Sequence, residues 1–310
     1  MNIEKIRLLR QETGAGLMDC KNALIEANGD DQHAMALLFE KGFHLAKKKA
    51  ERVAADGIAY ARVFGDRAVL LAVNSETDFT AGHPAFLSFV AVLAEVIARQ
   101  MPKDIDDLMS CFVEEQGKTV AELLQKMILR FRENLVIRGF ETLTGPMPIA
   151  YMHQNGRIGV ILNLSDHGSS DRESIRSIGM EIAMQIAAMH PRFVSRSELT
   201  AETILSIRQE ITEAVNEDEG LRSKPSQVRD KIVNGRLEKY FATNCLMEQA
   251  SIRDDSWTVR QYIDTMAGQT IGRINVTQFY RFEKGEGLLV EGHATDAQPI
   301  AMASRAGNVC

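Results

Sequence analysis

The sequence predicts an α+β protein, and three observations support this fold class. Residues 1–45 show the three- and four-residue apolar spacing of short amphipathic helices. From Gly57 onward the pattern changes to the alternation that is typical of strands. A strand pair followed by a helix then recurs about 90 residues further along the chain, which indicates two copies of one α+β unit.

The composition is that of an ordinary globular protein. The chain has 310 residues, 45% of them hydrophobic and 25% charged, which excludes wholesale disorder and collagen. The net charge of −6 does not favour a phosphate backbone as a ligand, so we expect no direct nucleic-acid partner. The four cysteines lie far apart, which argues against a zinc ribbon or a dithiol redox site and fits a reducing compartment.

We expect neither a membrane segment nor a targeting segment. The sequence has no apolar run of about 18 residues. Its first residues, Met-Asn-Ile-Glu-Lys-Ile, have neither the apolar region of a signal peptide nor the Arg- and Ser-rich character of a transit peptide. We therefore predict a cytoplasmic protein with no membrane partner.

The motifs that would identify an enzyme are missing from the sequence. It contains no GxxxxGKS/T phosphate loop, no HExxH and no GxSxG. The seven histidines are scattered and do not have the spacing of metal ligands. We therefore predict a binding protein without catalytic chemistry, cofactor or metal, although the many Asp and Glu residues leave a carboxylate site open.

Residues 1–52 are predicted to form a small module of three helices. The second helix has an apolar face made by Cys20, Ala23, Leu24 and Ala27. Asn28-Gly29 is expected to end this helix, because both residues tolerate the left-handed conformation. A bundle of this size has little core, so we interpret it as a docking module. We interpret the basic stretch 44–56 as a solvated linker helix, with a patch for an acidic partner as the alternative.

Residues 53–140 are predicted to form the first α+β subdomain. A hairpin turns at Gly65-Asp66, and an apolar helix follows and ends before Pro102. Two further helices are expected near 104–115 and 118–130, and a strand is expected to begin near Asn134.

Residues 141–287 are predicted to form the second subdomain. Its hairpin turns at Asn155-Gly156-Arg157, and the apolar helix that follows corresponds to that of the first copy. Residues 270–283 return to strand character and complete the second sheet. An insertion at about 198–243 is predicted to be an antiparallel coiled-coil hairpin with a narrow apolar seam, with two surface helices as the alternative. Residues 288–310 are expected to be a loose tail.

Several motifs of the chain resemble those of the translation elongation factor Ts family, in the family's order and over nearly the whole sequence. Two of them are Thr13 to Leu24 (TGAGLMDCKNAL) and Asn74-Ser75-Glu76-Thr77-Asp78-Phe79. The others are RVAADG at 52–57, Arg132-Glu133-Asn134, Ser223-Lys224-Pro225 with Gly235-Arg236, and RFEKGEG at 281–287. The resemblance implies a ubiquitin-associated-like helical module, two related subdomains and a coiled-coil hairpin inserted in the second.

The resemblance also implies the function. Elongation factor Ts is the guanine nucleotide exchange factor of the GTPase elongation factor Tu, from which it expels GDP without chemistry of its own. By the family's pattern, Asp78 and Phe79 intrude between helices of the Tu GTPase domain and weaken the contacts that hold Mg²⁺ and the β-phosphate. A homodimer formed through the coiled coil stays open.

The residues expected to contact Tu follow from the same resemblance. They are Thr77, Asp78 and Phe79, then Arg10, Leu17 and Met18 of the helical module, and Gln185 of the second subdomain. From residue type alone, Phe79 would be a core aromatic and Asp78 a helix cap, and the resemblance reverses this preference. For Leu17 and Met18, core positions and contact positions remain almost equally favoured.

The chain departs from the family's pattern at three places. Thr80-Ala81-Gly82 stands where the family usually has Val-Ala-Lys or Val-Ala-Arg, so one basic contact is missing. Gln185 stands where some members have His. Residues 288–310 do not resemble the helical end that some members use.

Two other function classes compete with exchange. One is an interaction scaffold that uses the helical module and the coiled coil, and the other is an enzyme with a carboxylate site in the core. A pull-down separates the scaffold from an exchange factor, because an exchange factor retains a GTPase that GDP and Mg²⁺ release.

Overall fold

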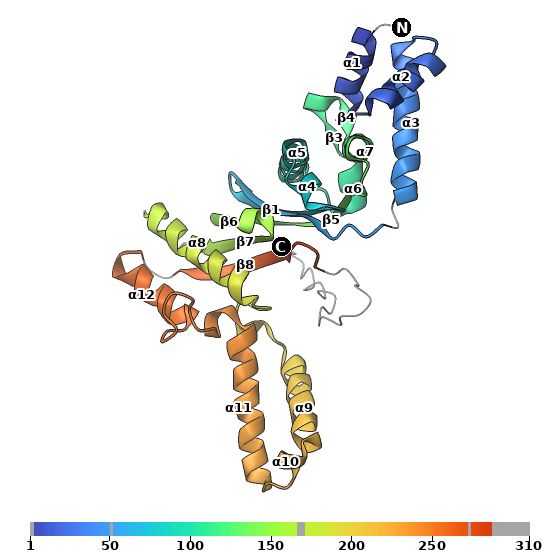
Figure 1. Ribbon diagram of the computed structural model, residues 1–310. Helices are drawn as coiled ribbons and strands as arrows, with labels where there is room; N and C mark the ends of the chain where they lie inside the picture. The colour runs from blue at the N-terminus through green and yellow to red at the C-terminus, as the bar shows by residue number, and fades with distance from the viewer. Residues whose placement is uncertain (1–2, 50–51, 166–170, 272–273, 287–310) are drawn as a thin grey trace.

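The computed structural model describes residues 3–49, 52–165, 171–271 and 274–286. These residues form an elongated molecule with a helical module at one end, two sheets with their helices in the middle, and a helical hairpin at the other end (Figure 1). Among them, no helix combines the length and the apolarity that a bilayer span requires. The observed architecture agrees with the predicted α+β class.

The helical module (residues 3–49) contains the three predicted helices, α1 (Ile3–Thr13), α2 (Leu17–Glu26) and α3 (Asp31–Lys49). Gly14 separates α1 from α2 with a φ of +73°, which favours glycine. One cluster of buried side chains holds the module together and includes one residue of the neighbouring subdomain. Its members are Ile6, Leu9, Ala15, Cys20, Ala23, Leu24, Ala27, Ala34, Leu38 and, from that subdomain, Leu129.

The first sheet is antiparallel, with strand order β1-β2-β5. Its strands are β1 (Asp56–Phe64), β2 (Arg67–Ser75) and β5 (Val136–Thr144). Four helices lie between β2 and β5 in the chain: α4 (Asp78–Ala81), α5 (Pro84–Gln100), α6 (Ile105–Ser110) and α7 (Val120–Phe131). Helices α5 and α7 contribute their apolar faces to the core that also contains Val69, Leu71 and Val73 of β2.

The prediction of a helix over 104–115 was too long, because α6 ends at Ser110. The chain then forms a short hairpin in which β3 (Phe112–Val113) pairs with β4 (Lys118–Thr119). Gly117, with a φ of +61°, allows the chain to reverse there. Thr119 then begins α7 with a capping box that it forms with Glu122.

The second sheet repeats this arrangement with strand order β6-β7-β8. Its strands are β6 (Met147–His153), β7 (Ile158–Ser165) and β8 (Asn275–Glu283). Helices α8 (Arg172–Met189) and α12 (Val259–Ile271) pack on it around a core that includes Ile149, Val160, Ile182, Ile186 and Ile263. As in the first sheet, a hairpin is followed by a helix and a later strand joins the second strand of the hairpin.

The two sheets pack against each other through small and branched side chains. This contact contains Ala61, Ala68, Leu70, Leu143 and Ile161. Gly159 of β7 lies so close to the first sheet that a Cβ there would be 2.7 Å from Cδ1 of Leu70 and 2.8 Å from the carbonyl oxygen of Ala59. Each sheet nevertheless has its own core. Strand β5 of the first sheet extends to Thr144, so the predicted boundary at residue 140 falls inside this strand, and the division into two subdomains stays a proposal.

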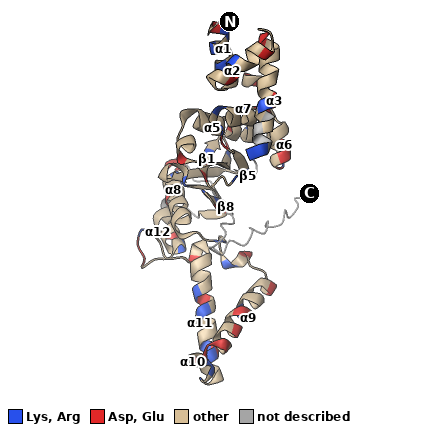
Figure 2. Cartoon of the chain, turned by 45° about the vertical axis from the view of Figure 1, so that its right-hand side comes forward, with Lys and Arg blue, Asp and Glu red and all other residues tan. Residues whose placement is uncertain are grey.

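The insertion forms a pair of antiparallel helices that projects from the second subdomain (Figure 1). The helices are α9 (Ala201–Glu217) and α11 (Ser226–Asn244), joined through α10 (Glu219–Arg222). Ile204, Ile207 and Ile211 pack with Leu237 and Phe241 in the apolar seam. Acidic side chains predominate on α9 and basic bands appear on α11 (Figure 2). Pairing of two such hairpins between chains remains a prediction.

Candidate functional site

The corner between β2 and α5, residues 76–83, carries three of the predicted contact residues. Thr77 caps the one-turn helix α4, and its Oγ1 accepts a hydrogen bond of 3.4 Å from the Thr80 amide. Thr80 is buried on the inner side of this turn, whereas Phe79 is 86% exposed. The alternative interpretation of Phe79 as a core aromatic is therefore wrong for this chain.

The corner joins α5 through a tightly bonded connection. The Gly82 amide donates to the Asp78 carbonyl at 2.8 Å. His83 caps α5, where its Nδ1 accepts from the Ala85 amide at 3.0 Å, and Pro84 is the first residue of the helix. The His83 ring also packs edge-on against Phe131 at the end of α7, with 5.1 Å between ring centroids. These contacts hold the end of α4 against the start of α5 and the end of α7.

The helical module presents a second group of predicted residues at its surface. Arg10 is exposed, and Leu17 and Met18 are 57% and 59% exposed. Both apolar residues lie in the first turn of α2, and the buried residues Cys20 and Leu24 follow them in the same helix. Leu17 and Met18 are therefore not core residues, and they leave apolar surface of the module open to a partner.

Asp19 lies beside Leu17 and Met18 but points inward. Its carboxylate forms an ion pair of 2.6 Å with Lys41 and a second ion pair with Arg132 of the first subdomain. Burial alone would raise the pKa of Asp19, but the hydrogen bond and charge of Lys41 and the charge of Arg132 outweigh it and hold the pKa below the ordinary value of 3.8. The ion pair between Asp19 and Arg132 therefore links the helical module to the first subdomain.

Gln185 does not lie where a contact residue is expected. Its side chain is 2% exposed, and its Nε2 donates to Gln249 Oε1 at 3.1 Å and to the Ala250 carbonyl at 3.0 Å. Its Oε1 accepts from the Ile252 amide at 2.8 Å. The prediction that Gln185 touches a partner does not agree with this burial, because the amide is used to fasten residues 249–252 to α8.

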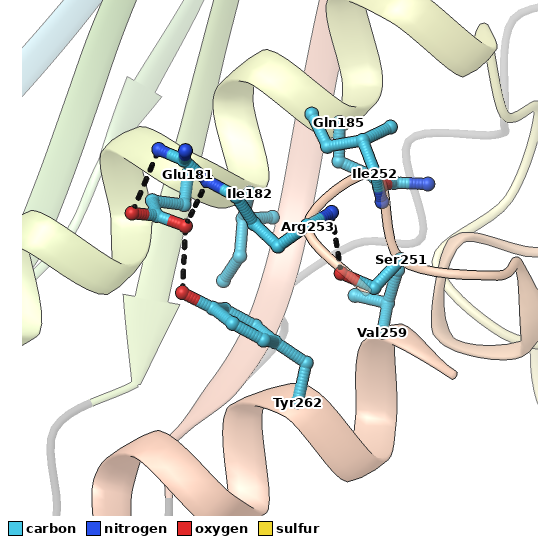
Figure 3. A pocket seen from close by; sticks show the side chains of 8 residues that line it. All are labelled: Glu181, Ile182, Gln185, Ser251, Ile252, Arg253, Val259 and Tyr262. Carbon is cyan, nitrogen blue, oxygen red and sulfur yellow. Dashed lines mark hydrogen bonds and ion pairs between the residues drawn. The ribbon is translucent and has the colours of Figure 1, made fainter. Parts of the chain in front are cut away.

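Gln185 also lines a small depression together with Glu181, Arg253 and Tyr262 (Figure 3). The Glu181 carboxylate accepts from Arg253 at 2.7 and 3.0 Å and from the Tyr262 hydroxyl at 2.6 Å. Burial and the hydrogen bond to Glu181 raise the pKa of Tyr262 to about 12. The carboxylate is thus engaged in holding α8 to α12. Within the described ranges, no three His, Cys, Asp or Glu side chains are grouped so that they could hold a metal ion.

Comparison with known proteins identifies the family. The family model of Elongation factor TS matches residues 76–286, which include the corner, strand β5 of the first sheet, the second sheet and the hairpin. Proteins named Elongation factor Ts from two strains of Clostridium kluyveri are each 37% identical to this chain over 290 residues, which is 92% of this chain and 93% of the relative. The chain belongs to the elongation factor Ts family. The resemblance noted in the sequence is therefore confirmed, and the protein is a translation elongation factor.

One feature of this elongation factor Ts homologue was missed by reasoning from its sequence. Glu133 and Asn134 lie against the corner, with the Glu133 carboxylate 2.7 Å from Thr77 Oγ1. The only signal was the motif Arg132-Glu133-Asn134, which belongs to the family resemblance but had no role assigned to it.

Proposed function

We propose that this member of the elongation factor Ts family is the guanine nucleotide exchange factor of elongation factor Tu. The observation that carries the proposal is that Phe79 is 86% exposed on a corner whose backbone is held by hydrogen bonds, because phenylalanine side chains are usually buried. In the proposed mechanism Asp78 and Phe79 enter between helices of the Tu GTPase domain. The displaced side chains of Tu then hold Mg²⁺ and the β-phosphate of GDP less tightly.

Phe79 cannot supply the whole effect. A thousandfold weakening of GDP binding requires about 4 kcal/mol. Burying one phenylalanine side chain supplies only ~1.5–3 kcal/mol. We therefore include a wider interface in the proposal, to which Arg10, Leu17 and Met18 of the helical module contribute. Gln185 is left out because its side chain is buried, and α8 takes part through its exposed end at Met189 and His190.

The decisive experiment measures the release of fluorescent GDP from elongation factor Tu by stopped flow, with and without the protein. We expect the release rate to rise with the concentration of the protein and to saturate. Immobilised protein should retain Tu, and GDP with Mg²⁺ should release it. Retention of Tu without faster release would favour the scaffold, and no retention at all would exclude both the exchange function and a scaffold role on Tu.

A further inference from the structure

The loop Arg132-Glu133-Asn134, between α7 and β5, contacts segments that are far away in the sequence. Glu133 Oε2 accepts from the backbone amides of Glu76 and Thr77, both at 3.1 Å. Its Oε1 accepts from the Thr77 hydroxyl at 2.7 Å. One carboxylate therefore receives three hydrogen bonds from the residues that precede α4.

The contact is reciprocal, because the corner also binds the loop. Glu76 Oε1 accepts from the Asn134 amide at 2.6 Å, and the Asn134 side chain donates to the Arg52 carbonyl at 2.7 Å. Asn134 is buried, and Glu76 also forms ion pairs with Lys49 at 3.8 Å and with Arg52 at 3.3 Å. These bonds determine where the strand end and the loop lie relative to each other.

The same loop also holds the helical module. The Arg132 guanidinium pairs with Asp19 of α2, and the Arg132 carbonyl accepts a hydrogen bond from Lys49 at the end of α3. A Cβ on Gly16 would be 3.1 Å from Arg132 Nη2, so the start of α2 lies directly against this side chain. The loop thus connects the surface of Leu17 and Met18 with the corner of Phe79.

The direction of the Phe79 ring depends on the backbone beneath it. The side chain is almost fully exposed, so little packing of its own orients it. Helix α4 has only four residues, and a helix this short is not stable by itself. Oγ1 of its cap residue Thr77 accepts a hydrogen bond from the Thr80 amide and donates one to the Glu133 carboxylate. A displacement of the Glu133 carboxylate would therefore move Thr77 and, with the helix that Thr77 caps, the ring of Phe79.

We propose that Glu133 is a positioning residue for nucleotide exchange, which acts through Thr77 to direct Phe79 at the partner. This inference rests on the exchange function proposed above. Without the carboxylate, the Glu76 and Thr77 amides and the Thr77 hydroxyl lose their acceptor, so α4 can adopt several orientations. Binding through the helical module would continue, whereas the fraction of complexes with a correctly placed ring would fall.

A double-mutant cycle tests this inference. Glu133→Ala is introduced into the wild-type chain and into the Phe79→Ala variant, and GDP release from Tu is measured at a saturating concentration of each protein. We expect Glu133→Ala to slow release by about tenfold in the wild-type background but by less than about twofold in the Phe79→Ala background. A residue that acts only through Phe79 has nothing left to position once the ring is removed.

Further variants separate positioning from loss of structure. Thr77→Ser keeps the hydroxyl and should retain most of the rate, whereas Thr77→Val removes it and should resemble Glu133→Ala. Glu210→Ala, at an exposed position of the hairpin, is the matched control and should not change the rate. Affinity for nucleotide-free Tu should fall by less than about threefold in Glu133→Ala, because the wider interface stays intact. If Glu133→Ala does not fold, Thr77→Val takes its place in the cycle.

The outcomes distinguish the two proposals. If the wild-type protein accelerates GDP release but Glu133→Ala slows it equally in both backgrounds, the positioning role is wrong and the exchange function stands. An unchanged rate in Glu133→Ala also overturns the inference alone. If the wild-type protein does not accelerate release, the exchange function fails and the positioning role fails with it.

Discussion

An exposed aromatic ring and a buried amide are the two residues at which the site differs most from what residue types suggest. Phe79 extends into solvent from a capped turn, whereas the polar Gln185 lies inside and uses both ends of its amide within the chain. For both residues, the role follows from the groups around the side chain and not from the residue type. Substitution of each residue gives a prediction that can be tested separately.

Phe79→Ala should slow exchange while leaving the fold intact. The lost burial in the complex corresponds to ~1.5–3 kcal/mol, so GDP release should slow by about 10- to 150-fold. The free energy of unfolding should stay within about 0.5 kcal/mol of wild type, because the ring is exposed in the free protein. Stopped-flow release and urea unfolding measure the two quantities. Unchanged GDP release would contradict the proposed role of the ring.

Gln185→Ala should have the opposite profile. It removes the hydrogen bonds that the amide of Gln185 makes with the Ile252 amide, with Oε1 of the buried Gln249 and with the Ala250 carbonyl, which should reduce the free energy of unfolding by roughly 3 kcal/mol. Ser177→Ala, at an exposed position of the same helix, is the control. Urea unfolding checks both variants. A stable Gln185→Ala variant with slowed exchange would instead restore Gln185 as a contact residue.

The sequence could indicate some of these residues and not others. Leu17 and Met18 were found because a short motif marks them, and periodicity left their exposure open. The burial of Gln185 depends on Gln249, Ala250 and Ile252, which follow the hairpin insertion and are distant in sequence. Local pattern cannot reveal such a contact. The role of Glu133 was hidden for the same reason, because its partners lie in the corner.

At the scale of elements, the base of the helical hairpin is held to the second subdomain by Arg196. Arg196 donates to Glu248 at 2.8 and 2.5 Å and to Glu238 of α11 at 2.9 Å, and its guanidinium lies 4.4 Å from the centre of the Phe241 ring. One side chain therefore fastens α11 to the segment that returns to the body. Such a planar, multidentate contact restrains direction better than a single ion pair.

This connection should be sensitive to acid. The hydrogen bond and charge of Arg196 hold the pKa of Glu248 below its ordinary value of 4.5. A lowered pKa in the folded state stabilises the fold above about 4.5, and this contribution is lost as the pH falls through the folded value. Arg196→Gln should therefore reduce the free energy of unfolding by about 1 kcal/mol at neutral pH. Well below pH 4.5 the part of the difference that comes from Glu248 should disappear, and urea unfolding across this range measures it. A difference that does not depend on pH would assign the effect to the Phe241 contact alone.

The two sheets should tolerate very little added volume where they meet. Gly159→Ala places a methyl group against Leu70 and the Ala59 carbonyl, and the shift of backbone should reduce the free energy of unfolding by about 1–3 kcal/mol. Gly139→Ala is the matched control, because its Cβ would meet nothing closer than the Phe282 ring at 3.9 Å. Thermal unfolding compares them. Equal melting temperatures would mean that the sheets can separate without loss of stability.

Most elements were predictable because their own residues define them. The apolar period gave the long helix α5, the alternation gave the β1–β2 hairpin, and the repeat gave the second copy. The end of α6 was not predictable, because the short β3–β4 hairpin depends on pairing between Phe112 and Thr119 rather than on apolar spacing. The third strand of each sheet was also indicated by its own residues, near Asn134 and within 270–283, although each pairs with a strand that lies far away in the sequence.

For the whole molecule, binding of Tu and binding of GDP must oppose each other by the same factor. Thermodynamic linkage requires that GDP weaken the affinity of this protein for Tu as much as the protein weakens the affinity of Tu for GDP. Titration of Tu with the protein, with and without saturating GDP and Mg²⁺, should give that factor, and Phe79→Ala should reduce it. Equal affinities in the two titrations would contradict exchange by displacement.

The exposure of Phe79 has a consequence for the tempo of translation. Because the ring is already exposed in the structure of the protein alone, this conformation can bind a partner without first opening. Each collision in the right orientation can proceed at once. The concentration of the factor, and no conformational step of its own, would then set how often a GDP-bound GTPase exchanges its nucleotide.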